Sequence, residues 1–177
     1  AEGPLTSVQT AAVTNVNDAP EAGSGAINNT GTLTERDDND PTPGGENRVP
    51  FNTSGVISVH DDDITDTHSV SVSQVSATYD INGSTAAGAF LGVFQAGFSE
   101  AITGDGNGTI GWTYNIGLPL PAGTSAAQMA VVDALADGES IVLVYNVTVT
   151  ETANTGGAFQ SFTQPVTITI HGTNDAP

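Results

Sequence analysis

At 177 residues the chain is long enough for one well-packed domain and too short for two large ones. Its 20 Asp and Glu residues face two basic residues, Arg36 and Arg48, and the resulting net charge of −18 makes nucleic acid and anionic lipid poor partners. No apolar run is long enough to span a membrane. The chain also has no cysteine, so a bound hard metal ion is the candidate substitute for the disulfides that often stabilise small secreted domains.

The beginning of the chain repeats its end. Asn17-Asp18-Ala19-Pro20 recurs as Asn174-Asp175-Ala176-Pro177, at an offset of 157 residues (174 minus 17). A fixed-period repeat predicts a tandem array. We expect residues 1–20 to be the terminal strand and linker of a preceding repeat, and residues 21–177 to be one complete repeat that ends in the next linker. Residues 1–16 can lie free, cover their own sandwich or pair with another copy.

The first half of the repeat combines short strands with acidic loops. Residues 31–34 resemble a strand that leads into an acidic cluster at 35–40, and turn signals follow at 40–45. Residues 54–59 predict a strand that ends in a second acidic cluster, 61–66. Residues 69–76 alternate Val with polar residues, which is typical of an amphipathic strand.

The second half contains the clearest elements. We expect a loop at 80–89, a short buried strand at 90–94, and a hairpin that turns at 104–108 and continues as a strand at 109–116. Residues 125–136 form the one predicted helix, with Thr124 or Ser125 as its N-cap and Gly138 at its C-terminal cap. Residues 140–150 and 164–171 predict an antiparallel pair of strands.

These elements predict an all-β fold, an immunoglobulin-like or cadherin-like Greek-key β-sandwich of about seven strands with one short helix. Several ordered blocks of sequence also resemble VCBS repeats. They are Gly55-Val56-Ile57-Ser58-Val59-x-Asp61-x-Asp63-x-x-Asp66-x-His68, the turn Asp105-Gly106-Asn107 before Trp112-Thr113-Tyr114, the stretch from Val132 to Val149, and the closing Val166–Pro177.

The resemblance covers the chain from about residue 28 to its end. It implies a calcium-rigidified module of large bacterial RTX-type surface adhesins, with roles in cell adhesion and biofilm formation. The unit differs from the family in two ways. It carries apparent insertions near 37–54 and 79–103, and the position after Thr150, often Asp in such repeats, is Glu151. Insertions of this kind are where a binding function can be added to a spacer.

The cluster at 61–66 is the first candidate calcium (Ca2+) site. Calcium prefers six to eight oxygen ligands, and alternating Asp residues on a tight loop can direct several carboxylates inward. We predict Asp61, Asp63 and Asp66 as ligands, with Asp62 pointing outward. The spacing is not that of an EF-hand, and the alternative interpretation is a solvated acidic turn.

Two further groups of ligands are predicted. In the cluster at 35–40, Glu35 follows a strand and is the leading candidate, accompanied by Asp37 and Asp40; Arg36 can instead pair locally with one of these carboxylates. The linkers resemble those of cadherins, in which carboxylate and amide oxygens share calcium between modules. The alternative for these linkers is an ordinary Asx turn. The linker candidates are Asn17, Asp18, Asn174 and Asp175.

The other chemistry-bearing residues point to structural roles. His60, His68 and His171 lack zinc-like spacing and are expected on strand surfaces, while Trp112 and Tyr114 are expected in the core. No nucleophile and base stand in a catalytic pattern, so we expect no enzyme.

We therefore expect a calcium-binding extracellular module of a secreted or surface-bound bacterial adhesin, monomeric in isolation, whose partners are neighbouring repeats of the same chain. The alternative is a calcium-dependent module that recognises polysaccharide or peptide through its inserted loops, where Phe90, Phe94 and Phe98 are the nearby aromatics.

Overall fold

Alternation of buried and exposed side chains along the strands produces two sheets with a shared core. The computed structural model describes residues 16–35, 51–117, 122, 125–154 and 156–173. Within these residues the elements are β1 (Glu21–Ile27), β2 (Thr30–Thr34), β3 (Phe51–His60), β4 (Thr67–Ile81), β5 (Ser84–Ala87), β6 (Val93–Thr103), β7 (Asn107–Ile116), α1 (Ala126–Val132), β8 (Ser140–Ala153) and β9 (Ser161–His171).

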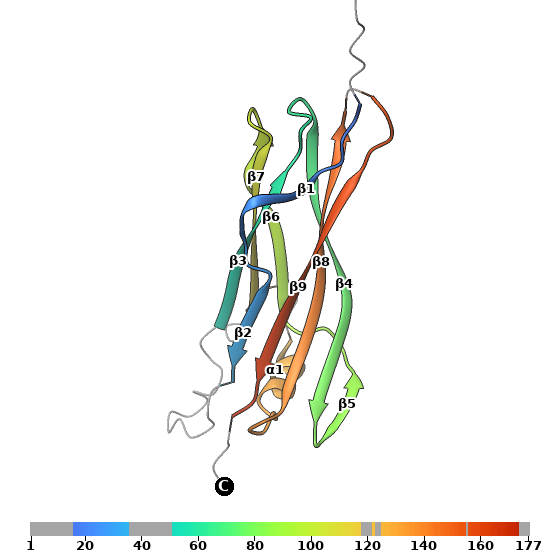
Figure 1. Cartoon of the computed structure of the whole chain (residues 1–177). Helices are drawn as coiled ribbons and strands as arrows, with labels where there is room; N and C mark the ends of the chain where they lie inside the picture. The colour runs from blue at the N-terminus through green and yellow to red at the C-terminus, as the bar shows by residue number, and fades with distance from the viewer. Residues whose placement is uncertain (1–15, 36–50, 118–121, 123–124, 155, 174–177) are drawn as a thin grey trace, which may run out of the picture.

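The order of the strands identifies the type of sandwich. One sheet has the order β1-β3-β7-β6 and the other the order β2-β9-β8-β4-β5, and the sheets form the two layers of Figure 1. All described strand pairs are antiparallel except β2 with β9. This is the Greek-key arrangement of an immunoglobulin-like sandwich, four strands against three, extended by β2 and β5 at the edges. The predicted all-β sandwich is confirmed.

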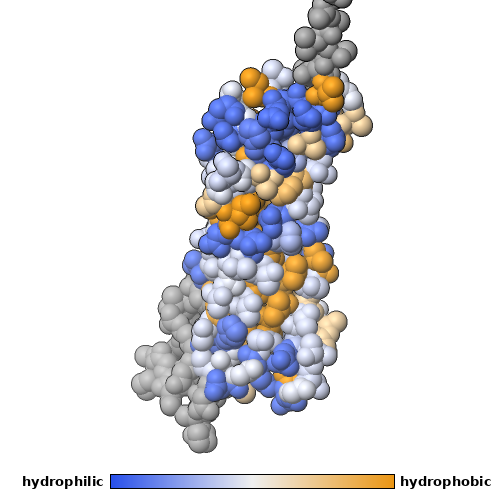
Figure 2. Space-filling model, in the orientation of Figure 1, coloured by the Kyte–Doolittle hydropathy of each residue, from blue (hydrophilic) through white to orange (hydrophobic). Residues whose placement is uncertain are grey.

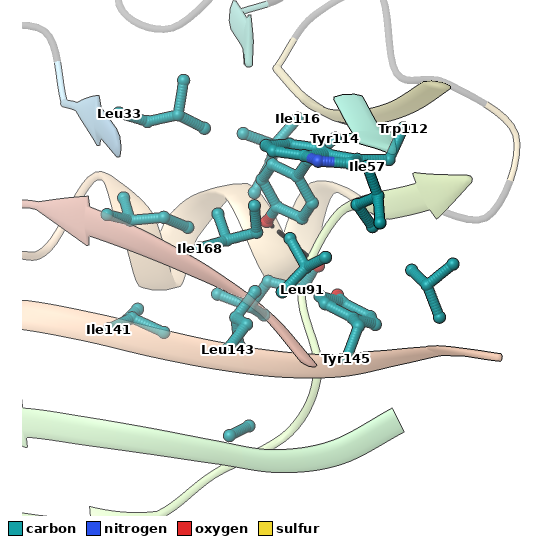
Figure 3. Close-up of a cluster of buried hydrophobic side chains, with 14 of the residues drawn as sticks. Leu33, Ile57, Leu91, Trp112, Tyr114, Ile116, Ile141, Leu143, Tyr145 and Ile168 are labelled. Carbon is teal, nitrogen blue, oxygen red and sulfur yellow. Dashed lines mark hydrogen bonds between the residues drawn. The ribbon is translucent and has the colours of Figure 1, made fainter. Parts of the chain in front are cut away.

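The core lies between the inward faces of the central strands. Trp112 and Tyr114 on β7 are buried, as predicted, and they face Tyr145 and Leu143 from β8. Figure 3 shows these side chains with Ile57, Ile141 and Ile168 around them. The Tyr114 hydroxyl donates a hydrogen bond to the backbone oxygen of Leu91 at 3.0 Å, which satisfies a buried polar group inside the core.

Three element predictions were wrong. Strand β1 was not predicted, because its Gly and Ala residues have low strand propensity and its pairing with β3 decides its conformation. The expected loop at 80–89 contains the end of β4 and the short strand β5, which pair around the turn at Asn82–Gly83. The strand expected at 90–94 begins at Val93 and runs on to Thr103, so the count of described strands is nine rather than about seven.

The helix is shorter than predicted. Ser125 is its N-cap, and a capping box with Gln128 closes the first turn. The helix ends at Val132 with Asp133 as its C-cap, so Gly138 does not cap it. Gly138 has φ of 85° and lies in the turn that joins Ala136 to Glu139 before β8, where Glu139 N donates to Ala136 O at 2.9 Å.

The chain enters and leaves the sandwich at opposite ends (Figure 1). The segment before β1, the loop between β3 and β4, the β6–β7 turn and the loop between β8 and β9 gather at one end, and α1 lies toward the other. Residues 1–15 lie outside the described part of the chain, so the assignment of residues 1–20 to a preceding repeat stays a prediction.

Candidate metal centre

Two inward-facing rows of apolar side chains end in carboxylates. On β3 the inward row continues from Ile57 and Val59 to Asp61, one residue beyond the strand. On β8 the inward row runs through Val147 and Val149 to Glu151. Because side chains alternate with a period of two along a strand, both carboxylates are directed into the end of the core and not to solvent.

A third carboxylate joins them from the start of β4. Asp61, Asp66 and Glu151 each offer an oxygen, and these oxygens all lie within 4.8 Å of one another. The three side chains are buried, with exposures of 0%, 4% and 1% respectively. Asp63, 8% exposed, lies near enough for its charge to act on Asp66. Four carboxylates therefore share the end of the sandwich where the chain enters.

The loop at 61–66 is fixed by its own hydrogen bonds. Asp61 Oδ1 accepts a hydrogen bond from Asp63 N at 2.8 Å, and Asp66 N donates to Asp63 O at 2.9 Å. Asp61 N also donates to Gly106 O in the β6–β7 turn at 2.8 Å. Gly106 has φ of 77°, a conformation that favours glycine. The loop backbone and the Asp61 carboxylate are thus held in position by hydrogen bonds of the chain itself.

Glu151 is oriented by donors from two other segments. Its Oε2 accepts hydrogen bonds from Asn154 Nδ2 at 2.9 Å, from Gln160 N at 3.1 Å and from Asn17 Nδ2 at 3.0 Å. Burial alone would raise the pKa of Glu151, but these hydrogen bonds outweigh burial and lower it. Glu151 is therefore set to remain ionised inside the cluster.

Asp66 has the opposite environment. Both of its carboxylate oxygens are buried, and neither has a hydrogen-bond partner among the described residues. Burial raises the pKa of Asp66, and the charges of Asp63, Asp61 and Glu151 raise it further. A buried carboxylate without donors is costly, so this group is the strongest sign in the cluster that a cation belongs beside it.

No strong base balances these charges in the described part of the chain. Both arginines of the sequence, Arg36 and Arg48, lie outside it. The histidine in contact is His68, whose Nε2 lies 2.8 Å from Asp61 Oδ2. Even at the largest separation in the cluster, 4.8 Å, two carboxylates repel each other by on the order of 3 kcal/mol at an effective dielectric constant of about 20.

The donor set fits calcium. Calcium binds oxygen at about 2.3–2.6 Å, so two ligands on opposite sides of the ion lie about 4.6–5.2 Å apart. The separation of the three carboxylates is compatible with one ion between them. Asn17 Nδ2 contacts Glu151, and Asn17 Oδ1 is a further buried oxygen that has no hydrogen-bond partner among the described residues. An all-oxygen set rich in carboxylates is what calcium prefers, and it lacks the nitrogen and sulfur ligands typical of structural zinc.

A pocket leads from the surface toward Asp66. It has a volume of about 170 Å³ and is lined by Asp66, Thr67, His68, Phe98, Ala101, Ile102 and Thr103. The pocket lies where the start of β4 faces the end of β6.

The structure also shows where the other residues of the predicted sites lie. Asp18 lies beside the cluster, where its backbone N donates to Asp63 Oδ2 at 2.6 Å. Asp62 points outward, as predicted, and pairs with His60. Glu35 is buried far from the cluster, beside Thr173, whose N donates to Glu35 Oε2 at 3.3 Å. The remaining candidates, Asp37, Asp40, Asn174 and Asp175, lie outside the described residues.

Two residues of the centre were missed by reasoning from the sequence. Glu151 was noted only as a departure from a family pattern, although its place in the inward row of β8 signals burial. His68 was expected on a strand surface, and this was wrong: its side chain is 2% exposed. On β4 it pairs across the sheet with Glu151, so its ring is enclosed with the carboxylates.

The aromatic residues near the 79–103 segment pack onto the core. Phe94 stacks on Tyr145, with ring centroids 4.4 Å apart, and Phe90 contacts the same tyrosine edge-on. Phe90, Phe94 and Phe98 are all partly buried against the core cluster. This packing gives the three phenylalanines a structural role beside the core.

No helix in the described part of the chain is long and apolar enough to cross a membrane.

Comparisons with known proteins give distant structural similarity only. No family model matches the chain, and no curated protein sequence matches it. Similar solved structures include the PapD-like domain 7 of human CEP192, with 11% identity, TM-score 0.42 and coverage of 98% of this chain and 100% of that one.

Two fimbrial proteins of Escherichia coli are also similar. AggA, the major subunit of aggregative adherence fimbriae type I, has 11% identity and TM-score 0.41 over 89% of this chain and 99% of that one. The CooA pilin subunit of enterotoxigenic Escherichia coli has 12% identity and TM-score 0.39 over 86% and 93%.

Proposed function

We propose that this chain is a calcium-binding repeat module of an extracellular adhesive protein, in which the ion stabilises the end of the sandwich and fixes the linker that enters it. The observation that carries the proposal is Asp66, whose two buried carboxylate oxygens have no hydrogen-bond partner among the described residues although Asp61 and Glu151 offer oxygens within 4.8 Å. A divalent cation beside Asp66 supplies the contacts that its oxygens lack and neutralises the repulsion among the three carboxylates.

The linker is part of the same centre. Asn17 binds Glu151 through its side chain, and its backbone oxygen accepts a hydrogen bond from Gln160 Nε2 at 2.9 Å. An ion held by Glu151 therefore also restrains the linker, because Asn17 Nδ2 donates hydrogen bonds to both carboxylate oxygens of Glu151. This links ion binding to the angle at which a preceding module is attached.

The course of the chain supports a role in an extended array. The described chain enters at one end of the sandwich and leaves at the other (Figure 1), and its linker sequence recurs after 157 residues. Modules connected end to end with fixed junctions form a stiff rod. The resemblance of the sequence to VCBS repeats agrees with a secreted or cell-surface location, and with neighbouring repeats as partners.

Calcium titration tests the proposal. Extracellular modules bind calcium with dissociation constants of about 10⁻⁴ to 10⁻³ M. At an ion concentration about 100 times the dissociation constant, one site adds about 2.7 kcal/mol to the free energy of unfolding, or roughly 5–10 °C in melting temperature. We expect this increase in calcium relative to chelator, and a much smaller one in magnesium, which needs tighter octahedral geometry.

Asp62 provides the matched control. Asp66→Asn and Asp62→Asn remove the same charge from the same loop, but the Asp62 side chain is 76% exposed and points away from the cluster. Asp66→Asn should abolish calcium binding measured by calorimetry, whereas Asp62→Asn should retain it. Equal effects of the two variants, or a wild-type melting temperature that calcium leaves unchanged, would reject the proposal.

A further inference from the structure

Large hydrophobic side chains are exposed beside the carboxylate cluster. In the described residues, four large hydrophobics are more than half exposed: Val16 at 69%, Phe159 at 58%, Val75 at 53% and Ile64 at 52%. All but Val75 belong to the segments that build the centre, and we call Val16, Ile64 and Phe159 the junction face. Figure 2 shows strongly hydrophobic groups among the hydrophilic ones at this end, next to where the grey trace begins.

Hydrogen bonds of the centre hold the junction face in place. Each of its residues is next to an anchored one: Val16 precedes Asn17, whose O accepts from Gln160 Nε2 at 2.9 Å, and Phe159 precedes Gln160, whose N binds Glu151. Ile64 N itself donates to Asp62 O at 3.1 Å. These side chains therefore point outward from a fixed backbone. Their exposure to water is unfavourable, and a partner that covered them would bury this apolar surface.

The junction face adjoins a hollow that can receive a partner. An open depression of about 540 Å³ is lined by Val16, Asn17, Gly156, Gly157, Ala158 and Gln160. Its lining is small or apolar apart from the two amide side chains. Exposed apolar side chains rimmed by polar residues are a feature of protein–protein interaction sites.

The internal repeat indicates which partner is held there. Aligning the two Asn-Asp-Ala-Pro copies puts Val16 on Thr173 and position 14 on His171, the last residue of β9. The last strand of a preceding repeat would thus end two residues before Val16. Two extended residues span at most about 7 Å, so the end of that repeat is held within contact distance of the junction face.

We infer that the junction face is the docking surface for the preceding repeat of the tandem chain. This inference rests on the proposed array of modules. It adds an apolar contact between modules to the ion at the same end of the sandwich. A short linker keeps the two modules at an effective concentration in the millimolar range. A small apolar contact is therefore sufficient within the chain, although it is too small to join separate molecules.

A two-module protein tests the inference. Joining residues 1–172 to a second copy of residues 16–177 preserves the 157-residue period and gives the second module its own Val16 in place of Thr173. Because the chain has no cysteine, a Ser71→Cys substitution in each copy provides one spin-label site per module on the exposed side of β4. The distance between the labels is measured by pulsed electron paramagnetic resonance in saturating calcium.

We expect a narrow distance distribution for the two-module protein. Replacing Ile64 and Phe159 by Ser in the second copy should lose the narrow distribution, because the modules then move freely about the linker. Val75→Ser is the matched control, since Val75 is equally exposed but belongs to β4, and it should leave the distribution narrow. A distribution that is broad in the unsubstituted protein, or unaffected by the double substitution, overturns the inference.

Two other occupants have distinct signatures, and either would overturn the inference. If residues 1–15 of the same chain covered the face, the double substitution would lower the melting temperature of the single-module chain. If a glycan did, the single-module chain would bind a glycan array and lose that binding on Phe159→Ser. Calorimetry on the double variant separates this test from the proposed function, because neither side chain carries an ion ligand and calcium affinity should be unchanged.

Discussion

His68 and Asp61 form a buried pair in which Nε2 of the imidazole lies 2.8 Å from Oδ2 of the carboxylate, with side-chain exposures of 2% and 0%. The other oxygen of Asp61 accepts a hydrogen bond from Asp63 N. Asp61 is thus held from two directions, and one of its oxygens lies within 4.8 Å of an oxygen of Asp66 and of Glu151. His68 acts as a positioning residue for a ligand of the proposed ion.

Replacing His68 should weaken calcium binding without removing a ligand. We expect His68→Ala to lower calcium affinity by about 10–100-fold, the usual cost of losing a group that orients a metal ligand. His68→Gln keeps a donor and should recover part of the loss. Calorimetric titration measures both.

His60 supplies the control for this experiment. It makes a similar contact with Asp62 at 3.0 Å, but its side chain is 27% exposed and its partner lies outside the cluster. His60→Ala should leave calcium affinity unchanged. If His60→Ala and His68→Ala weakened binding equally, the positioning role would be wrong and a general effect on the loop would explain the loss.

Removing the charge of Asp66 should have opposite effects with and without calcium. In chelator, Asp66→Asn should raise the melting temperature, because it removes a buried carboxylate that has no hydrogen-bond donor among the described residues and faces three other carboxylates. In saturating calcium the variant should melt below the wild type, because it lacks a ligand. Melting curves in both buffers test this crossover, and a variant less stable in both would contradict it.

The pH dependence of stability should reverse when calcium is added. The pKa of Asp66 is raised above its ordinary 3.8, mainly by burial and then by the neighbouring charges. The folded protein therefore holds this proton more tightly than the unfolded chain does. The stabilisation is complete below pH 3.8 and is lost as the pH rises through the folded-state pKa.

Glu151 contributes in the opposite direction, because its pKa is lowered, so the comparison is with Asp66→Asn. In chelator, the wild type should lose stability relative to this variant as the pH rises from about 4 to 7. In calcium, the wild type should instead gain over the same range, because ion binding requires ionised carboxylates. Thermal melts at several pH values measure both slopes, and parallel curves for the two proteins would refute the assignment to Asp66.

Gly55 is expected to be intolerant of a side chain. It pairs with Trp112 across β3 and β7, and an added Cβ would lie 2.5 Å from Trp112 Cζ2 and 2.6 Å from Asn28 O. The same oxygen accepts the hydrogen bond from Trp112 Nε1 at 2.7 Å. Gly55→Ala should therefore displace the indole and cost about 1–3 kcal/mol in free energy of unfolding.

Gly97 provides the control for packing at Gly55. It lies on β6, and a Cβ there would meet no atom of the described residues within 4 Å. Gly97→Ala should be neutral or slightly stabilising in denaturant unfolding, since strand propensity improves. A comparable loss from both substitutions would mean that backbone conformation, and not contact with Trp112, limits the residue at position 55.

Most of the fold could be predicted from local patterns. Residues 140–150 and 164–171 alternate apolar and polar side chains, and they form β8 and β9 with the expected antiparallel pairing. Strand β1 and the β4–β5 hairpin could not be predicted, because their Gly, Ala and Ser residues carry little apolar pattern. Pairing with a neighbouring strand decides their conformation.

The candidate centre was predictable only in part. Asp61, Asp63 and Asp66 are close in sequence, so their clustering alone predicts them as candidate ligands. Asn17 and Glu151 are 134 residues apart, and no local pattern connects them. His68 was misplaced because an isolated histidine on an alternating strand gives no indication of which face is buried at the end of a sandwich.

The all-β class, the acidic loop and the repeated linker can be read along the chain, because period-two alternation, residue chemistry and repetition are local features of a sequence. The positions of Asp61 and Glu151 at the ends of facing rows of core residues, with Asp66, His68 and Asn17 around them, depend instead on tertiary packing. Burial of both apolar faces fixes the register between distant strands. That register carries the polar residues at the ends of those rows into one buried space.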